Sequence, residues 1–130
     1  MVGVVVVSHS AKIAEGVCEI AFQMAKAGQK IVSAGGTVDG GIGTDAVRIC
    51  EAVKAADAGS GVVIMVDLGS AVMSAETALE LLEYPLKGIV QIADAPIVEG
   101  TLIAVVQASL GSNLTEVLAA ANETRHLHKK

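Results

Sequence analysis

The sequence predicts an α/β fold, a three-layer sandwich in which a mainly parallel, four-stranded sheet has helices on both faces. Two observations support this prediction. Four short runs rich in Val and Ile are typical of buried parallel strands, and segments with helical spacing alternate with them along the chain. The length of 130 residues suits one core. We therefore expect a single domain over residues 1–125 and a polar tail over 126–130.

The first strand–helix unit covers the start of the chain. Residues 2–7 (VGVVVV) are nearly all β-branched, as is typical of a central parallel strand. A helix is expected over residues 11–27, because Ser10 is a good N-cap and Gly28 can end the helix. Helical spacing gives this segment one apolar stripe, expected to face the core. The stripe consists of Ile13, Val17, Ile20, Ala21 and Met24.

In the second unit, a glycine-rich loop separates the strand from the helix. Residues 30–34 are the second expected strand. The loop at 35–43 (GGTVDGGIG) has five glycines in nine residues, and Thr44 is then expected to cap a helix that ends at Ala56.

The second half of the chain contains two further units. Residues 62–66 (VVIMV) are the third expected strand, and the segment from Asp67 to Ser70 opens a helix that Tyr84 and Pro85 end. Residues 87–93 are the fourth expected strand. Two helices, over 98–110 and 114–124, are expected to follow it.

Charge and composition exclude several classes of protein. The chain has 9 basic and 14 acidic residues, one Phe, one Tyr and no Trp, which disfavours nucleic-acid binding. No apolar run reaches the ~18 residues that a membrane helix needs. Cys18 and Cys50 lie beside apolar residues in expected helices, which indicates two small buried side chains rather than a disulfide or a metal pair. We expect a cytoplasmic protein.

A candidate site lies where the strands end. In parallel sheets the chemistry sits outside the carboxyl ends of the strands. His9, the only histidine outside the tail, follows the first strand, and Asp67 follows the third. A neutral imidazole nitrogen is a nucleophile near pH 7, and a carboxylate on the other ring nitrogen fixes the tautomer. The two residues therefore predict a nucleophilic histidine oriented by Asp67, unless His9 is a solvated loop residue and Asp67 a helix cap.

The glycine-rich loop has more than one interpretation. Glycines let backbone N–H groups approach a phosphate, but a surface turn that needs positive φ would look the same. Residues 41–46 (GIGTDA) match the dinucleotide pattern GxGxxA only weakly, because they follow the second strand and lack the ribose-binding acid. No P-loop occurs. A receiver domain is excluded, because it needs acidic residues where Ser8, His9 and Ser10 stand. A metal site is also not expected, because the chain has no second histidine outside the tail to serve as a ligand.

Four motifs together resemble a known family. They are VSHS at residues 7–10, the glycine loop with GIGT at 41–44, DLGSA at 67–71 and PIVEG at 96–100. In this combination the chain resembles the phosphoryl-transfer subunit of the phosphoenolpyruvate-dependent dihydroxyacetone kinase. That subunit is similar to enzyme IIA of the mannose-type sugar phosphotransferase system (PTS), and the resemblance covers nearly the whole chain.

The resemblance implies a phosphotransferase subunit with a phosphohistidine intermediate. His9 would accept a phosphoryl group from the phosphocarrier protein HPr and pass it to ADP on the nucleotide-binding subunit of dihydroxyacetone kinase. Asp67 would support His9. No tightly bound cofactor or metal is implied, only the transient phosphoryl group, and the protein would be a cytoplasmic homodimer. The residues that match the surroundings of the phosphoryl group, besides Ser10 at the helix start, are Gly43, Thr44, Gly69 and Ser70.

Two alternatives remain open at this point. A mannose-type sugar enzyme IIA would share the chemistry and differ in its acceptor, a histidine on a sugar-specific domain. A non-catalytic module that binds a nucleotide or another small ligand would use the glycine loop to hold a ligand phosphate. The isolated chain would then bind nucleotide stoichiometrically, whereas a phosphocarrier would not.

Overall fold

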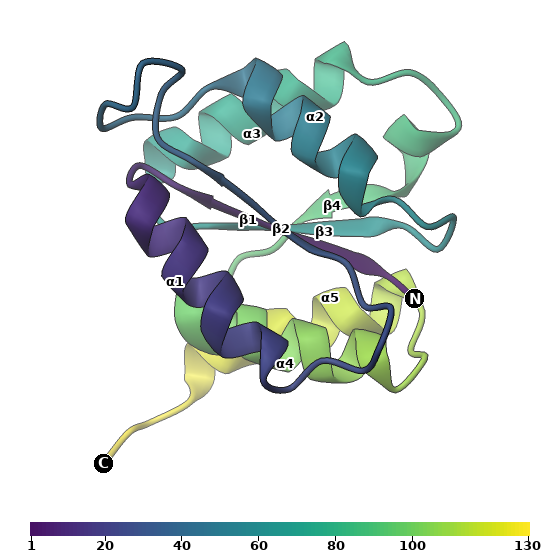
Figure 1. The fold of residues 1–130 in the computed structure, drawn as a ribbon. Coiled ribbons are helices and arrows are strands. Elements are labelled where there is room, and N and C mark those ends of the chain that lie inside the picture. Colours follow the sequence, from purple (N-terminus) through teal and green to yellow (C-terminus); the bar gives the residue numbers. More distant parts are fainter.

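A computed structural model describes all 130 residues and shows three layers, with a sheet between two layers of helices (Figure 1). Helices α1, α4 and α5 cover one face of the sheet, and α2 and α3 cover the other. The strands are β1 (Gly3–Ser8), β2 (Ile31–Gly35), β3 (Val62–Val66) and β4 (Val90–Ile92). The helices are α1 (Ala11–Phe22), α2 (Ala46–Ala56), α3 (Gly69–Leu81), α4 (Ile97–Ser109) and α5 (Leu114–Glu123). None of them is long and apolar enough to cross a membrane.

The sheet is parallel throughout, with strand order β2-β1-β3-β4. The α/β prediction is therefore confirmed. Because all four strands run in the same direction, the loops that follow them lie along one edge. In the pairing of the two central strands, Val7 of β1 stands opposite Val66 of β3. The residues that follow these two strands are thus brought side by side.

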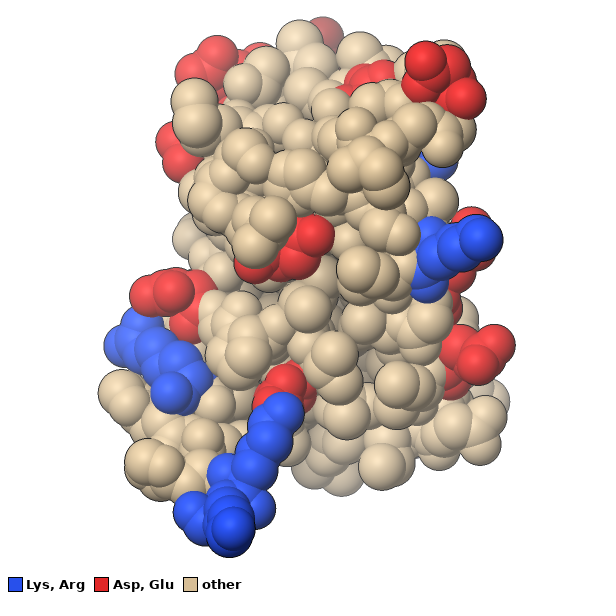
Figure 2. Space-filling model, turned by 90° about the vertical axis from the view of Figure 1, so that its left-hand side faces the viewer, with Lys and Arg blue, Asp and Glu red and all other residues tan.

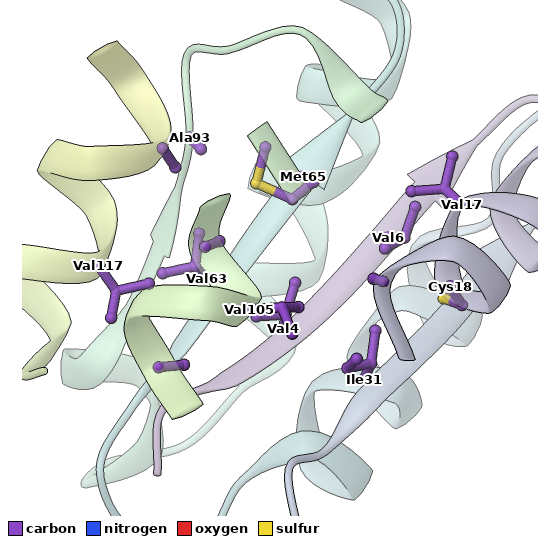
Figure 3. Close-up of a cluster of buried hydrophobic side chains, with 14 of the residues drawn as sticks. Val4, Val6, Val17, Cys18, Ile31, Val63, Met65, Ala93, Val105 and Val117 are labelled. Atoms are coloured by element: carbon purple, nitrogen blue, oxygen red, sulfur yellow. The ribbon is translucent and has the colours of Figure 1, made fainter. Parts of the chain in front are cut away.

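The core is divided by the sheet into two apolar clusters. Side chains alternate along β1, so Val4 and Val6 pack toward α1 and α4, while Val5 and Val7 pack toward α2 and α3. Figure 3 shows the first cluster, in which Val63 and Met65 of β3 lie near Val105 and Val117. Cys18 belongs to this cluster and Cys50 to the other, and both are free thiols. Their predicted burial is confirmed.

The fourth strand is shorter than the sequence predicts. Residues 86–89 form a 3₁₀ turn, in which Gly88 N–H donates to the Pro85 carbonyl at 3.1 Å, and pairing with β3 begins only at Val90. The turn uses backbone groups that a strand would have offered to its neighbour.

Two expectations for the helices are wrong. The cap of α2 is Asp45 rather than Thr44, because the Asp45 carboxylate accepts from the Val47 N–H at 2.8 Å. Helix α1 ends at Phe22, five residues early, with Gln23 as its C-cap. The other predicted bounds agree with the structure to within two residues.

The expected apolar stripe of α1 does not all face the core. Val17 and Ala21 are buried, but Ile13, Ile20 and Met24 are 51%, 47% and 56% exposed. The side chains that touch the sheet are the smaller ones at Ala14, Val17, Cys18 and Ala21, which let the helix pack close to the strands. The larger apolar residues are left on an outer flank of α1.

Candidate functional site

The candidate site is built on the ends of the two central strands. His9 follows β1 and Asp67 follows β3, and the His9 ring Nδ1 lies 2.9 Å from Asp67 Oδ1. The side chains are 21% and 14% exposed, so the pair is partly shielded from water but open to a partner. The expected proximity of His9 and Asp67 is present in the structure.

The Asp67 carboxylate is held by four hydrogen bonds. Its Oδ2 accepts from the Ser8 hydroxyl at 2.9 Å and from the His9 backbone N–H at 3.0 Å. Its Oδ1 accepts from the His9 ring and, at 2.8 Å, from the Leu68 N–H. A carboxylate held at both oxygens cannot rotate without breaking several bonds at once, so Oδ1 stays aimed at Nδ1.

These contacts also determine the charge of Asp67. Partial burial on its own would raise the pKa of the carboxyl group. The hydrogen bonds from the His9 backbone and ring, from Ser8 and from Leu68 together outweigh burial and hold this pKa below its ordinary value of 3.8. Asp67 is therefore an ionised, acceptor-only group at neutral pH.

An acceptor at Asp67 fixes the tautomer of His9. Because the carboxylate only accepts, ring Nδ1 carries the proton, and in the neutral ring Nε2 carries the free lone pair. Nε2 lies 2.6 Å from the Ser70 hydroxyl, which therefore donates to it. Nε2 is thus the ring nitrogen of His9 whose lone pair can attack an electrophile.

Nε2 faces the start of helix α3. Ser70 lies in the first turn of α3, and Leu68, the N-cap, makes no side-chain hydrogen bond to that turn. First-turn N–H groups without a cap favour a bound anion, and the helix dipole adds to this preference. A phosphoryl group on Nε2 would lie beside this helix end.

The glycine loop packs against the other side of His9. Gly43 N–H donates to the His9 carbonyl at 2.8 Å. Gly35, where the loop begins, passes so close to α1 that a Cβ there would lie 2.7 Å from the Ser10 carbonyl oxygen. Only glycine fits at this position, which holds the loop against the segment that carries His9.

The other predicted site residues make no hydrogen bond to the His9 ring. Ser10 is the N-cap of α1, and its hydroxyl accepts from the Ile13 N–H rather than contacting the His9 ring. The Thr44 hydroxyl lies 2.6 Å from the Ser74 hydroxyl and shares no hydrogen bond with His9. Gly69 is the first residue of α3, next to Ser70. His9, Asp67, Ser70 and Gly43 therefore form one hydrogen-bonded group, which Ser10 and Thr44 border.

Ser8 has a structural role that the sequence does not predict. Ser8 is fully buried, and its hydroxyl accepts from the Ser10 N–H at 3.1 Å while donating to Asp67. One signal for it was available, since a small polar residue ends an otherwise apolar strand. Ser8 therefore positions the carboxylate from behind, without touching the reactive nitrogen.

Replacing Ser8 with Ala is expected to slow phosphorylation of His9 about tenfold and to lower the free energy of unfolding by roughly 1 kcal/mol. The substitution removes one bond from Asp67 and leaves the Ser10 N–H without its acceptor. Nitrogen NMR of the His9 ring measures the tautomer directly, and the Nδ1–H form should be less populated in the variant. Ser33→Ala, at an exposed serine of β2, is the control. An unchanged tautomer and rate in Ser8→Ala would show that Ser8 only fills space.

A cavity of about 530 Å³ opens beside Asp67, between the start of α3 and the end of β4. Its walls are mostly apolar, and its acidic side chains are those of Asp67, Glu76 and Asp94, the last paired with Arg125 at 2.7 Å. Figure 2 shows this edge of the molecule, where uncharged residues cover most of the surface. A protein that approaches His9 therefore meets a largely uncharged face with scattered acidic and basic side chains.

Comparison with known proteins identifies the family to which the chain is similar. Residues 3–118 match the EIIA-man model, described as the PTS system fructose IIA component. A crystal structure of a protein of unknown function, EF1359, is 38% identical, with a TM-score of 0.83 and coverage of 92% of both chains.

Two curated relatives have the same function in their names. The phosphoryl donor subunit DhaM of the PEP-dependent dihydroxyacetone kinase of Escherichia coli (strain K12) is 46% identical over 121 residues, which are 91% of this chain and 26% of that protein. The corresponding subunit of dihydroxyacetone kinase 2 of Listeria innocua serovar 6a is 42% identical over 118 residues, 91% of this chain and 94% of that one. The chain thus spans about a quarter of the E. coli protein and nearly all of the Listeria protein. By these matches it belongs to the EIIA-man family, among the DhaM phosphoryl donor subunits.

Proposed function

We propose that this chain is a phosphohistidine carrier that takes a phosphoryl group from HPr and delivers it to ADP on the nucleotide-binding subunit of a dihydroxyacetone kinase. The observation that carries the proposal is the His9–Asp67 contact of 2.9 Å, which leaves Nε2 with its lone pair at the start of α3. The names of the DhaM relatives support the choice of substrate system.

The first transfer is a displacement at phosphorus. The Ser70 hydroxyl first turns away from Nε2. The Nε2 lone pair then attacks the phosphorus of the donor's phosphohistidine, and the bond from phosphorus to the donor nitrogen breaks, its electron pair staying on that nitrogen. The His9 ring keeps its Nδ1 proton and gains positive charge. Ionised Asp67, already hydrogen-bonded to Nδ1–H, stabilises that charge without reorganising.

The second transfer reverses the bonding at His9. An oxygen of the terminal phosphate of ADP attacks phosphorus, the bond from phosphorus to Nε2 breaks, and its electron pair returns to Nε2. Such transfers pass through a loose transition state in which charge lies on the equatorial oxygens. The backbone N–H groups of Gly69 and Ser70 and the Ser70 hydroxyl are the donors placed to stabilise them.

A reconstituted system tests the proposal. The chain is incubated with phosphoenolpyruvate, enzyme I and HPr, together with the nucleotide-binding and dihydroxyacetone-binding subunits, and dihydroxyacetone phosphate is measured. Formation of product only when this chain is present supports the proposal. An active set of partner proteins that makes no product with this chain would overturn it.

The same mixture, with a mannose-type transporter domain added as a second acceptor, distinguishes the alternatives. If the chain becomes phosphorylated but passes the group only to a mannose-type transporter domain, it is a sugar enzyme IIA. If it is never phosphorylated yet binds nucleotide in equal amount, it is a ligand-binding module. Intact mass before and after acid treatment separates these outcomes, because phosphohistidine is acid-labile.

A further inference from the structure

Helix α3 has two serines one turn apart on the same side. Ser70 and Ser74 stand four positions apart, so their side chains are neighbours on the surface of the helix. The Ser70 hydroxyl lies 2.6 Å from His9 Nε2, and the Ser74 hydroxyl lies 2.6 Å from the Thr44 hydroxyl. One side of α3 is therefore hydrogen-bonded to the His9 ring at its first turn and to the end of the glycine loop at the next.

The Ser74 hydroxyl bonds to another element rather than to its own helix. A serine or threonine hydroxyl inside a helix can instead bond to the carbonyl four residues earlier. Thr77 of α3 is an example, since its hydroxyl donates to the Met73 carbonyl at 3.1 Å. Ser74 meets Thr44 across the molecule, and both side chains are half-buried. The contact joins α3 to the segment that precedes α2 in the same layer of the fold (Figure 1).

The bond between Ser74 and Thr44 closes a circuit of contacts that begins and ends at His9. Gly43, which precedes Thr44, donates its N–H to the His9 carbonyl at 2.8 Å. The circuit then passes from Thr44 to Ser74 and along one turn of α3 to Ser70. The Ser70 hydroxyl returns it to the imidazole of His9. The main chain and the side chain of His9 are thus both linked to the first two turns of α3.

Apolar packing holds the position of α3 mainly through small side chains. Its fully buried residues are Ala71, Ala75 and Ala78. A buried alanine makes fewer van der Waals contacts than a leucine or isoleucine, so it resists rotation of a helix about its axis less. A hydrogen bond from Ser74 to a neighbouring segment therefore adds a constraint on that rotation, at the turn next to Ser70.

We propose that Ser74 is a positioning residue for phosphoryl transfer, whose bond to Thr44 holds the first turn of α3 in place beside His9. The inference rests on the proposed function, because it concerns the rate of that transfer. The Ser70 hydroxyl and the N–H groups of Gly69 and Ser70 all lie in this turn. Stabilisation of the equatorial oxygens depends on donors that are already in position, so a small displacement of the turn slows the reaction.

Ser74→Ala tests this role, with Thr77→Ala as the matched control. Both changes remove a hydroxyl from α3, and alanine favours a helix at both places, but only the Ser74 hydroxyl is bonded outside the helix. Single-turnover phosphorylation is followed over a range of HPr concentrations. In Ser74→Ala the rate at saturating HPr should fall about tenfold, while the concentration at half-saturation changes by no more than about twofold. Thr77→Ala should react at the wild-type rate.

Thr44→Val removes the other hydroxyl of the pair and keeps the shape of the side chain. If both hydroxyls act through one bond, Thr44→Val and Ser74→Ala should slow transfer by the same factor. The double variant should then be no slower than either single variant. Ser74→Thr, which keeps a hydroxyl at this position, should recover most of the wild-type rate.

Nitrogen NMR of the unphosphorylated chain gives a readout that needs no partner protein. The Nε2 resonance of His9 reports the hydrogen bond from Ser70, and the Nδ1 resonance reports the bond to Asp67. Ser74→Ala should shift the Nε2 resonance and leave that of Nδ1 in place. Thr77→Ala should shift neither.

Two results would overturn the proposal. One is a Ser74→Ala chain with the wild-type rate and the wild-type Nε2 resonance, which would make the bond to Thr44 a local feature of the fold. The other is a double variant much slower than either single variant, which would give the two hydroxyls separate roles. A wild type that takes no phosphoryl group from active HPr would instead contradict the proposed function. The Nε2 resonance would still decide whether Ser74 positions the first turn of α3.

Discussion

A His9→Gln chain is expected to accept no phosphoryl group from HPr, while wild type gains one acid-labile group per chain. Glutamine keeps much of the size and polarity of the imidazole but has no nucleophilic nitrogen, and no other side chain takes the place of Nε2 beside Ser70. The side chain is 21% exposed and contributes little to the core, so the free energy of unfolding should change by no more than about 1 kcal/mol. Intact mass and urea unfolding measure the two effects.

The tail provides a matched control for this substitution. His126→Gln makes the same change at an exposed histidine far along the chain and should leave phosphorylation intact. A phosphoryl gain in His9→Gln equal to that of wild type would assign the reaction to another residue. If His9→Gln does not fold, His9→Asn is compared with wild type in its place.

Much of this site follows from a rule about parallel sheets. Short β-branched runs showed where the strands lie, and parallel strands end at one edge, so His9 and Asp67 were expected close together. That expectation depends on β1 and β3 being neighbours, which the strand order β2-β1-β3-β4 satisfies. The sequence pattern alone identified His9, Asp67 and the sheet edge on which they lie, but it gave no distance between them.

Other features depend on packing that a linear pattern does not contain. Asp45 caps α2 in place of Thr44 because backbone geometry, rather than residue preference, decides between two adjacent caps. The sequence places Ser8 just past the first predicted strand, and only its buried contact with Asp67 shows its position behind the carboxylate. The spacing of apolar residues on α1 predicts a single core face, whereas the small residues pack on the sheet and the larger ones stay exposed.

The second large effect is expected from Asp67→Asn, which should slow phosphorylation of His9 by roughly 10²- to 10⁴-fold. The amide has the size of the carboxylate but carries no charge. Its NH₂ group would face N–H or O–H donors that in wild type bond to a carboxylate oxygen. The ring then loses its preference for the Nδ1–H tautomer and the stabilisation of positive charge. Single-turnover phosphorylation by HPr measures the rate. Asp94→Asn, at the aspartate that follows β4 on the same edge, is the control and should change the rate far less.

The pH dependence of stability separates the charge of Asp67 from its shape. A carboxyl group whose pKa is lower in the folded state than in the unfolded chain stabilises the fold fully above its ordinary pKa, and this contribution is lost as the pH falls through the folded value. The difference in free energy of unfolding between wild type and Asp67→Asn should therefore shrink as the pH falls below the ordinary carboxyl pKa of 3.8. A difference that stayed constant down to pH 2 would mean that the hydrogen bonds stabilise the site without favouring the ionised form. In that case the carboxylate would not be the group that holds the proton on Nδ1 and leaves Nε2 free to react.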